Sequence, residues 1–354
     1  MEHDSSKLMA DKILVIRFSS LGDIILLTPL FREIKKIYPD STLDFLTSTT
    51  FAPLCQNNPN INHILSLDRK GGKKELNRIV QQCRKEGYTL VFDAHQSLRS
   101  RVLLIKCFGI FSTFSRKIRR IDKRSLKRNL LLHAKINLLR LFPSQREAFC
   151  RMLEGEGNGS PIDLSTELFP GQENKERVDI LQVKKGIDFA RSVVVGPGAS
   201  FKGKCWPVEN FLELTRLLNQ DGFQVILLGT MDEEEPFWIE EKSEGEVINL
   251  AGELSFLDSA ELLRRCRVAV SNDSAITHFA EAMKTPSVTI FGPTVKEFGF
   301  GPFLTESQLV DVELPCRPCS RNGKGGCKIK KQYECLRSIS VNRVYRLTRE
   351  ILDL

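Results

Sequence analysis

The chain has 354 residues and a net charge of +8, with 41% hydrophobic and 27% charged residues. These values are typical of a globular protein, and the length predicts two domains rather than one. The first residues, MEHDSSKLMADK, have no apolar core, and no apolar run approaches the ~18 residues of a membrane span, so we expect neither a signal peptide nor a transmembrane helix. Ten cysteines in such a chain favour free thiols or a metal site over disulfides.

The first third of the chain alternates short apolar runs with helical patterns. Strands are predicted at 12–18, 42–48, 63–68 and 89–95, and helices at 23–38 and 73–86. Strand–helix repetition of this kind predicts a parallel sheet covered by helices.

Residues 154–185 are rich in Gly, Pro and charge, which is typical of a linker. The alternation then restarts. A strand and turn are predicted at 192–200, strands at 224–230, 268–273 and 287–294, and helices at 207–220, 258–266, 274–284 and 340–352. The chain is therefore expected to hold a second α/β domain with its own parallel sheet.

Small and polar residues gather where the predicted strands end, which is where parallel sheets bind ligands. After the first strand come Ser19, Ser20, Gly22 and Asp23. Asp23 has two interpretations: it caps the following helix, or it is a general base at the edge of a cleft. The dinucleotide motif G-x-G-x-x-G is absent from this loop, which argues against hydride transfer.

In the second half, Asn272 and Asp273 end a strand, and Ser274 and His278 share one face of the next helix. The start of that helix favours a bound phosphate. Lys202 and Lys204, in GPGASFKGKCWP, have the charge to bind the same phosphate, although both also fit a solvated loop. Either Asp232 or Glu233 suits a ribose hydroxyl, or both simply complement a helix dipole.

Two further features stand out. Cys316, Cys319, Cys327 and Cys335 form C-x2-C-x7-C-x7-C, which fits either a structural zinc site or a set of packed thiols. Residues 99–140 hold 13 Lys/Arg and one acid, Asp122, interleaved with apolar residues. That pattern predicts a helix on an anionic membrane surface, a helix face packed on the first domain or, as a weaker alternative, a nucleic-acid-binding surface.

Four stretches together resemble glycosyltransferase family 9, the ADP-heptose:lipopolysaccharide heptosyltransferases. They are ILVIRFSSLGDIILLTPLFREIKKIYPD, GPGASFKGKCWPVENF, SNDSAITHFAEAMKTPSVTIFGPT and CRPCSRNGKGGC with CLRSI. The resemblance implies an α/β GT-B fold of two Rossmann-like domains facing a central cleft. Residues 1–170 would bind the acceptor, residues 171–340 would bind the nucleotide sugar, and the helix 341–354 would pack back on the amino-terminal domain.

The resemblance also implies roles for single residues. Asp23 corresponds to the base, Lys204 to the lysine that contacts the phosphates, and Asp273, Ser274 and His278 to the nucleotide-binding run. Ser19, Ser20 and Gly22 belong to the same nucleotide-sugar site. One departure is Ala275, where the family usually has glycine, so that a methyl group stands where the diphosphate would rest.

The function expected from the sequence is inverting, metal-independent transfer of heptose from ADP-heptose to the lipopolysaccharide inner core. The alternatives are a GT-B transferase with another nucleotide-sugar donor and a basic nucleic-acid-binding protein. We expect no catalytic cofactor, a structural zinc at most, a lipopolysaccharide core or lipid A acceptor, no nucleic-acid partner, and a cytoplasmic protein on the inner face of the membrane.

Overall fold

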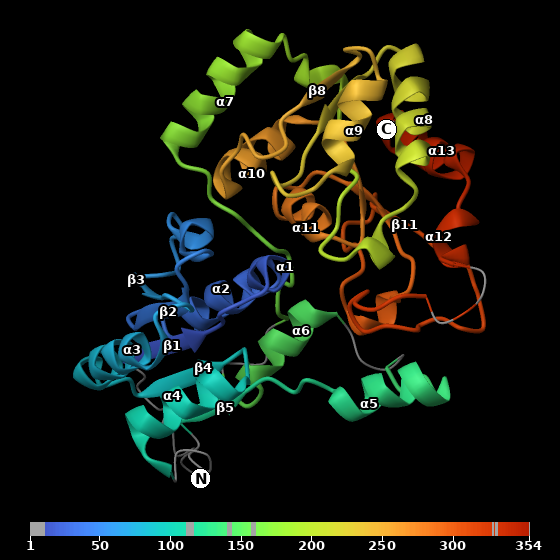
Figure 1. Cartoon of the computed structure of the whole chain (residues 1–354). Coiled ribbons are helices and arrows are strands. Elements are labelled where there is room, and N and C mark those ends of the chain that lie inside the picture. Colours follow the sequence, from blue (N-terminus) through green and yellow to red (C-terminus); the bar gives the residue numbers. More distant parts are fainter. Residues whose placement is uncertain are drawn as a thin grey trace. The chain divides into compact units, whose positions relative to one another are not determined.

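The computed structural model describes residues 11–110, 117–139, 144–156, 161–327, 329 and 332–353. The chain divides into two compact units (Figure 1). The first consists of Met1–Lys123 and Arg146–Leu164, and the second of Arg124–Gln145 and Ser165–Leu354. Each unit contains one parallel sheet with helices on both faces, which confirms the predicted α/β class. Across the described ranges, no helix combines the length and apolarity needed to span a membrane.

The first unit is built on a five-stranded sheet of order β3-β2-β1-β4-β5. Its strands are β1 (Lys12–Ile16), β2 (Thr42–Ser48), β3 (His63–Leu67), β4 (Leu90–Asp93) and β5 (Ile118–Arg120). The first four were predicted, whereas β5 was not. Because helices cover both faces, these strands are almost continuously apolar, as in KILVI, instead of alternating.

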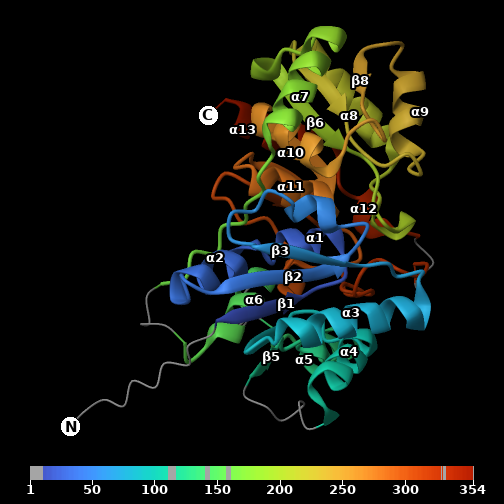
Figure 2. The same ribbon diagram turned by 90° about the vertical axis from the view of Figure 1, so that its left-hand side faces the viewer.

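The helices of the first unit lie on both faces of that sheet (Figure 2). They are α1 (Leu21–Ile25), α2 (Thr28–Ile37), α3 (Gly72–Glu86), α4 (Leu98–Phe108) and α6 (Gln145–Cys150). Helices α3 and α4 pack on the face that carries Leu14 and Ile16. The single helix predicted at 23–38 is in fact two, because Pro29 in the first turn of α2 has no N–H to continue α1.

The second unit has a six-stranded sheet of order β11-β10-β9-β6-β7-β8. The strands are β6 (Ser192–Gly196), β7 (Gln224–Leu227), β8 (Val247–Asn249), β9 (Val268–Asn272), β10 (Ser287–Ile290) and β11 (Gln308–Val310). The helices are α5 (Ser125–Asn129), α7 (Gln172–Lys185), α8 (Val208–Gln220), α9 (Glu235–Lys242), α10 (Phe256–Arg265), α11 (Ala275–Ala282), α12 (Glu334–Arg337) and α13 (Val341–Leu352).

One part of the predicted linker is helical. Residues 172–185 form α7, which ends at Gly186 in the left-handed conformation (φ 65°). Helix α7 is tied to α10, since Asn174 Nδ2 and Arg177 Nε donate to Asp258 Oδ1 at 2.8 and 2.9 Å. The sequence did not predict this helix because its composition is polar. Polar contacts and the buried side chain of Val178 hold the helix in place.

The predicted docking of the last helix on the amino-terminal domain is wrong. Val344, Ile351 and Leu352 of α13 belong to the core of the second unit, beside β9, β10 and α8. Polar contacts also join α13 to the second unit. Arg343 donates to Asp311 O at 2.7 Å, and Arg267 donates to Leu352 O at 2.8 Å. The sequence correctly predicted the apolar face of this helix. An apolar face alone does not determine which of the two cores it packs against.

Candidate functional site

The loop after β1 forms a first candidate site, within the first unit. Ser20 is the N-cap of α1 and Asp23 its third residue, and the two form a capping box. Asp23 Oδ2 accepts hydrogen bonds from the Ser20 N–H at 3.2 Å and from the Ser20 hydroxyl at 2.7 Å. Gly22 is buried, whereas Ser19 is half-buried and Ser20 exposed. The capping interpretation of Asp23 is therefore confirmed, and it leaves room for a second role.

Arg17 sets the charge of this loop. Its guanidinium lies 2.7 Å from Asp23 Oδ2, donates to Ala94 O at 2.5 Å, and stacks over the Phe149 ring at 5.3 Å. Burial favours the protonated form of Asp23, but Arg17 and the Ser20 hydrogen bonds outweigh it and lower the pKa of the carboxyl group. Asp23 is therefore ionised at neutral pH.

Asn272, at the end of β9, organises a second candidate site, within the second unit. Its Oδ1 accepts from the Trp206 N–H at 2.9 Å, and its Nδ2 donates to Pro197 O at 2.6 Å. One fully buried amide thus joins the loop after β6 to the K-x-W-P stretch. Gly196 allows close packing here, because a Cβ at that position would lie 2.3 Å from Ile276 Cδ1 and would displace the end of that side chain.

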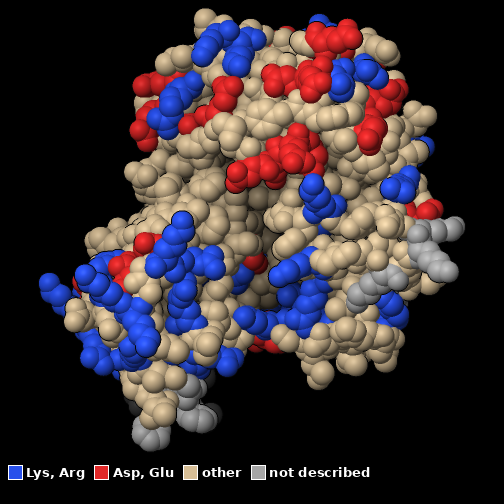
Figure 3. Space-filling view, in the orientation of Figure 1, with Lys and Arg blue, Asp and Glu red and all other residues tan. Residues whose placement is uncertain are grey.

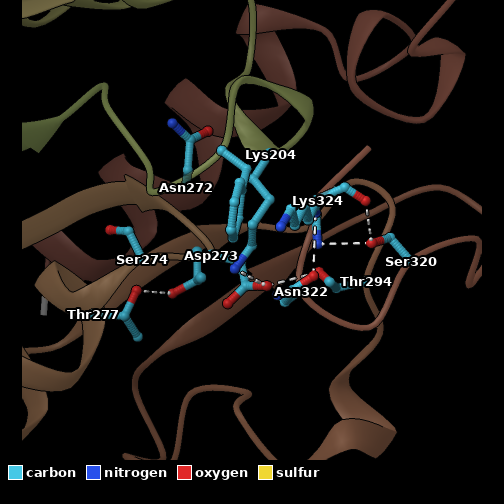
Figure 4. Close-up of polar contacts among 12 residues, drawn as sticks. Lys204, Asn272, Asp273, Ser274, Thr277, Thr294, Ser320, Asn322 and Lys324 are labelled. Atoms are coloured by element: carbon cyan, nitrogen blue, oxygen red, sulfur yellow. Dashed lines mark hydrogen bonds and ion pairs between the residues drawn. The ribbon is translucent and has the colours of Figure 1, made fainter. Parts of the chain in front are cut away.

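Lys204 and Asp273 meet in this second site (Figure 4). Lys204 Nζ lies 2.7 Å from Asp273 Oδ2, and the Thr294 hydroxyl donates to the same oxygen at 2.7 Å. Gly323 packs against the lysine, since a Cβ there would lie 2.2 Å from Lys204 Cγ. The ammonium group is thereby held at the carboxyl edge of the sheet, whereas Lys202 is mostly exposed and lies 3.6 Å from Glu234.

Helix α11 begins at the same edge. Ser274 is its N-cap and accepts from the Ile276 N–H at 3.4 Å, and Ala275 is its half-buried first residue. His278 is buried, with its ring 6.4 Å from that of Phe300. The structure thus brings Lys204, Asp273 and Ser274 together at a helix start, while Ser19, Ser20, Gly22 and Asp23 belong to the other unit.

Of the two acids proposed for ribose, only Glu233 points into the strand-end loops. A Cβ at Gly198 would lie 2.3 Å from Glu233 Cδ, and one at Gly229 would lie 2.5 Å from its Oε2. The Thr230 N–H donates to Glu233 Oε2 at 3.0 Å, and burial raises the pKa of this carboxyl group. The side chain of Asp232, by contrast, is exposed.

The four carboxy-terminal cysteines are all described, and each is a reduced cysteine outside any disulfide. Burial is the main cause that raises the pKa of Cys335 to about 11, with smaller contributions from Cys319, Cys316 and Cys327. Among the residues that the structure describes, no group of three or more His, Cys, Asp or Glu side chains could hold a metal ion. The zinc site therefore stays a sequence prediction that metal analysis of the purified protein would test.

The basic segment 99–140 is divided between the two units. Arg119 pairs with Glu156 at 2.5 Å in the first unit. In the second, Arg128 donates to Phe298 O at 2.9 Å and Lys135 to Pro318 O at 2.7 Å. Arg116 and Arg140 lie outside the described residues. Internal contacts thus use several of these cations, and part of the segment packs on the second unit, not the first.

The comparisons with known proteins agree on one family. A model of glycosyltransferase family 9 (heptosyltransferase) matches residues 76–329. Among curated relatives, lipopolysaccharide heptosyltransferase 2 of Salmonella typhimurium is 26% identical, over 81% of this chain and 84% of its own. Lipopolysaccharide heptosyltransferase 3 of Escherichia coli is 25% identical, over 77% and 80%.

Solved structures extend this likeness to the fold. The glycosyl transferase family 9 protein of Veillonella parvula has a TM-score of 0.79 at 20% identity, covering 97% of each chain. ADP-heptose lps heptosyltransferase II of Escherichia coli has a TM-score of 0.75 at 21% identity, over 96% of this chain and 98% of that one. These likenesses confirm the predicted GT-B class.

Proposed function

Because the chain belongs to glycosyltransferase family 9, we propose that it transfers heptose from ADP-heptose to a hydroxyl group of the lipopolysaccharide inner core. The family match over residues 76–329 carries this proposal. Relatives named lipopolysaccharide heptosyltransferases, similar over about four fifths of both chains, support it. The reaction inverts the anomeric carbon and uses no catalytic metal.

In this reaction an acceptor oxygen attacks the anomeric carbon of heptose from the face opposite to ADP. The new C–O bond forms as the bond to the β-phosphate breaks, and the hydroxyl proton passes to Asp23. A carboxylate that is ionised at neutral pH suits this task. Its ion pair with Arg17 makes it a weak base, so we expect the proton to move late, when bond formation has made the hydroxyl group acidic.

ADP leaves with an additional negative charge, which needs stabilisation in the transition state. Lys204 and the free N–H groups at the start of α11 are suited to supply it. Lys204 is paired with Asp273, so its ammonium group is already positioned before the diphosphate arrives. Positioning of this kind lowers the cost of reorganisation during the reaction. We assign the ribose hydroxyls to Glu233, whose carboxylate borders Gly198 and Gly229.

The distribution of charge supports an anionic acceptor on the first unit. Met1–Lys123 and Arg146–Leu164 together hold 23 Lys/Arg and 16 Asp/Glu, a net charge of +7, whereas the rest of the chain holds 29 and 28. Basic side chains crowd the region of α3 and α4 in Figure 3. Lipopolysaccharide cores bear phosphate and carboxylate groups, which such a surface would attract.

The same surface is our candidate for contact with the cytoplasmic leaflet of the membrane. Helix α4 exposes Leu98 (80%) and Ile105 (38%) with Arg101 between them. Arg101, Leu104, Ile105 and Arg120 line a small open cavity of about 210 Å³. Apolar side chains flanked by cations are the composition that binds anionic bilayers.

A donor screen tests the function. The purified protein is incubated with a heptose-deficient lipopolysaccharide acceptor and a panel of ADP- and UDP-sugars, and products are read by mass spectrometry. We expect the acceptor to gain one heptosyl residue with ADP-heptose alone. Transfer from another nucleotide sugar would instead favour the alternative donor, and no transfer from any donor would reject the proposal.

A further inference from the structure

The turn after β4 lies directly beside the loop that carries Asp23. Strands β1 and β4 are parallel neighbours in register, with Ile16 opposite Asp93, so they end at the same level. Two residues further on, the Phe18 and His95 rings meet edge to face, with centroids 5.4 Å apart. Because Arg17 bonds both Asp23 and Ala94 O, it joins the two loops.

Several contacts fix the His95 backbone. Asp93 Oδ1 accepts from the N–H groups of His95 at 3.2 Å and Gln96 at 2.7 Å, and Lys123 Nζ donates to Gln96 O at 2.7 Å. Gln96 has a φ of 47°, in the left-handed region that non-glycine residues seldom adopt. A turn held by this many bonds points the side chain of His95 in one direction.

The two ring nitrogens of His95 differ in their surroundings. Nδ1 is buried and bonds to no residue that the structure describes. Among buried side-chain atoms that lack a partner, His95 contributes Nδ1 and not Nε2, so we assign ligand contact to Nε2. Packing against Phe18 alone would need only an aromatic ring, and a histidine there leaves one buried nitrogen unsatisfied, which carries a cost.

The imidazole is also uncharged at neutral pH. Burial is the main cause, and with Arg17 and Lys123 it lowers the pKa of His95 to about 4, although Asp23 acts in the opposite direction. A neutral imidazole hydrogen-bonds a hydroxyl group without competing with Asp23 for its proton. The edge of the sheet therefore presents a carboxylate and a neutral hydrogen-bonding ring side by side, among cations.

We propose that His95 is an acceptor-positioning residue, whose Nε2 hydrogen-bonds a hydroxyl group of the acceptor sugar and holds the attacking oxygen toward Asp23. This inference rests on the proposed function. It assigns recognition of a sugar hydroxyl to the turn after β4, whereas the lysines and arginines of the same unit serve the acidic groups of the acceptor.

The test compares two variants that differ in chemistry at one position. His95→Phe keeps a ring against Phe18 and removes the hydrogen bond, whereas His95→Gln keeps a neutral hydrogen-bonding group. The control is His63→Phe, which changes an exposed histidine at the first residue of β3 in the same unit. For each protein, KM for the heptose-deficient acceptor, kcat, ADP affinity and Tm are measured.

We expect His95→Phe to raise the acceptor KM about 10-fold, the size of one lost hydrogen bond, with ADP affinity and Tm close to the parent. His95→Gln should restore most of the acceptor affinity that His95→Phe loses. His63→Phe should change neither the acceptor KM nor kcat. An unchanged acceptor KM in active His95→Phe would overturn the inference and leave the proposed function standing. A fall in Tm or kcat without a change in the acceptor KM would also overturn it, because that result marks a packing role. A parent protein that transfers nothing would overturn both proposals.

Discussion

The Arg17 guanidinium and the Asp23 carboxylate form an ion pair of 2.7 Å at the end of the first strand. The oxygen in that pair, Oδ2, is also the one that accepts both hydrogen bonds from Ser20. Asp23 is therefore anchored through a single oxygen, and we expect its Oδ1 to meet the acceptor hydroxyl. A helix cap and a general base are compatible here, because the cap uses one half of the carboxylate and catalysis needs the other.

Replacing Asp23 by Asn should remove the base and keep much of the cap. We expect kcat to fall by about 10²-fold or more while ADP affinity stays within about 2-fold, because the proposed diphosphate contacts, Lys204 and the start of α11, belong to the second unit. Steady-state kinetics and calorimetry with ADP measure the two effects. The matched control is Ser20→Ala, which removes a cap contact and keeps the carboxylate. Turnover near that of the parent in Asp23→Asn would exclude the base role.

Arg17 should control the acid side of the pH–rate profile. Its charge lowers the pKa of Asp23, so Arg17→Met leaves burial dominant and the pKa rises. The fall in kcat/KM on acidification should then begin at a higher pH than in the parent. The stability that the ionised carboxylate contributes is present above its unfolded pKa and is lost as pH falls through the lower folded pKa. Identical acid limbs in both proteins would contradict this account of Asp23.

Lys204→Ala should weaken ADP binding by at least about 10-fold. It should also lower Tm, because Asp273, only 8% exposed, loses its cation. The double variant Lys204→Ala/Asp273→Asn separates the effects: stability should return, since no buried charge is left unpaired, and ADP affinity should not. Lys202→Ala, two residues away and solvent-exposed, is the control. Calorimetry showing parental ADP affinity for Lys204→Ala would remove this lysine from the phosphate site.

Glu233 and Asp232 offer a test with a built-in control. Glu233→Gln should weaken binding of ADP and of adenosine alike, by several-fold, because a carboxylate accepts hydrogen bonds from ribose hydroxyls better than an amide does. Asp232→Asn should leave both affinities unchanged. Equal affinities for all three proteins would argue that neither acid contacts the ribose.

The sequence located the polar strand ends well, because a buried strand followed by SSLGD or SNDS is a local signal. The sequence could not show that Asn272 hydrogen-bonds to two loops that lie 66 and 75 residues away in the chain. An asparagine at a strand end is equally expected as the cap of the next helix. The sequence also did not show that Arg128 bonds to Phe298 O and ties residues 124–145 to the second unit. A basic amphipathic pattern indicates that one face of a helix packs against other residues. The pattern does not identify those residues, which are known only from the fold.

Membrane contact through α4 should depend on its exposed apolar and basic side chains together. The triple variant Leu98→Ser/Arg101→Ser/Ile105→Ser removes two apolar groups and one cation. The cation alone contributes roughly 1 kcal/mol near an anionic surface, so we expect partitioning into vesicles of phosphatidylglycerol and phosphatidylethanolamine to fall more than 5-fold at low salt. The acceptor KM should rise and ADP affinity should not change.

The control for that experiment lies on α7, where Ile180→Ser/Val183→Ser/Lys184→Ser also removes two exposed apolar groups and one exposed cation. General loss of charge or hydrophobicity would reduce the partitioning of both variants equally. If only the α4 variant lost partitioning, the membrane contact would lie on the first unit, next to the turn that carries His95. If both variants partitioned like the parent, membrane contact through α4 would be excluded. The cations of the first unit would then bind only the soluble part of the acceptor.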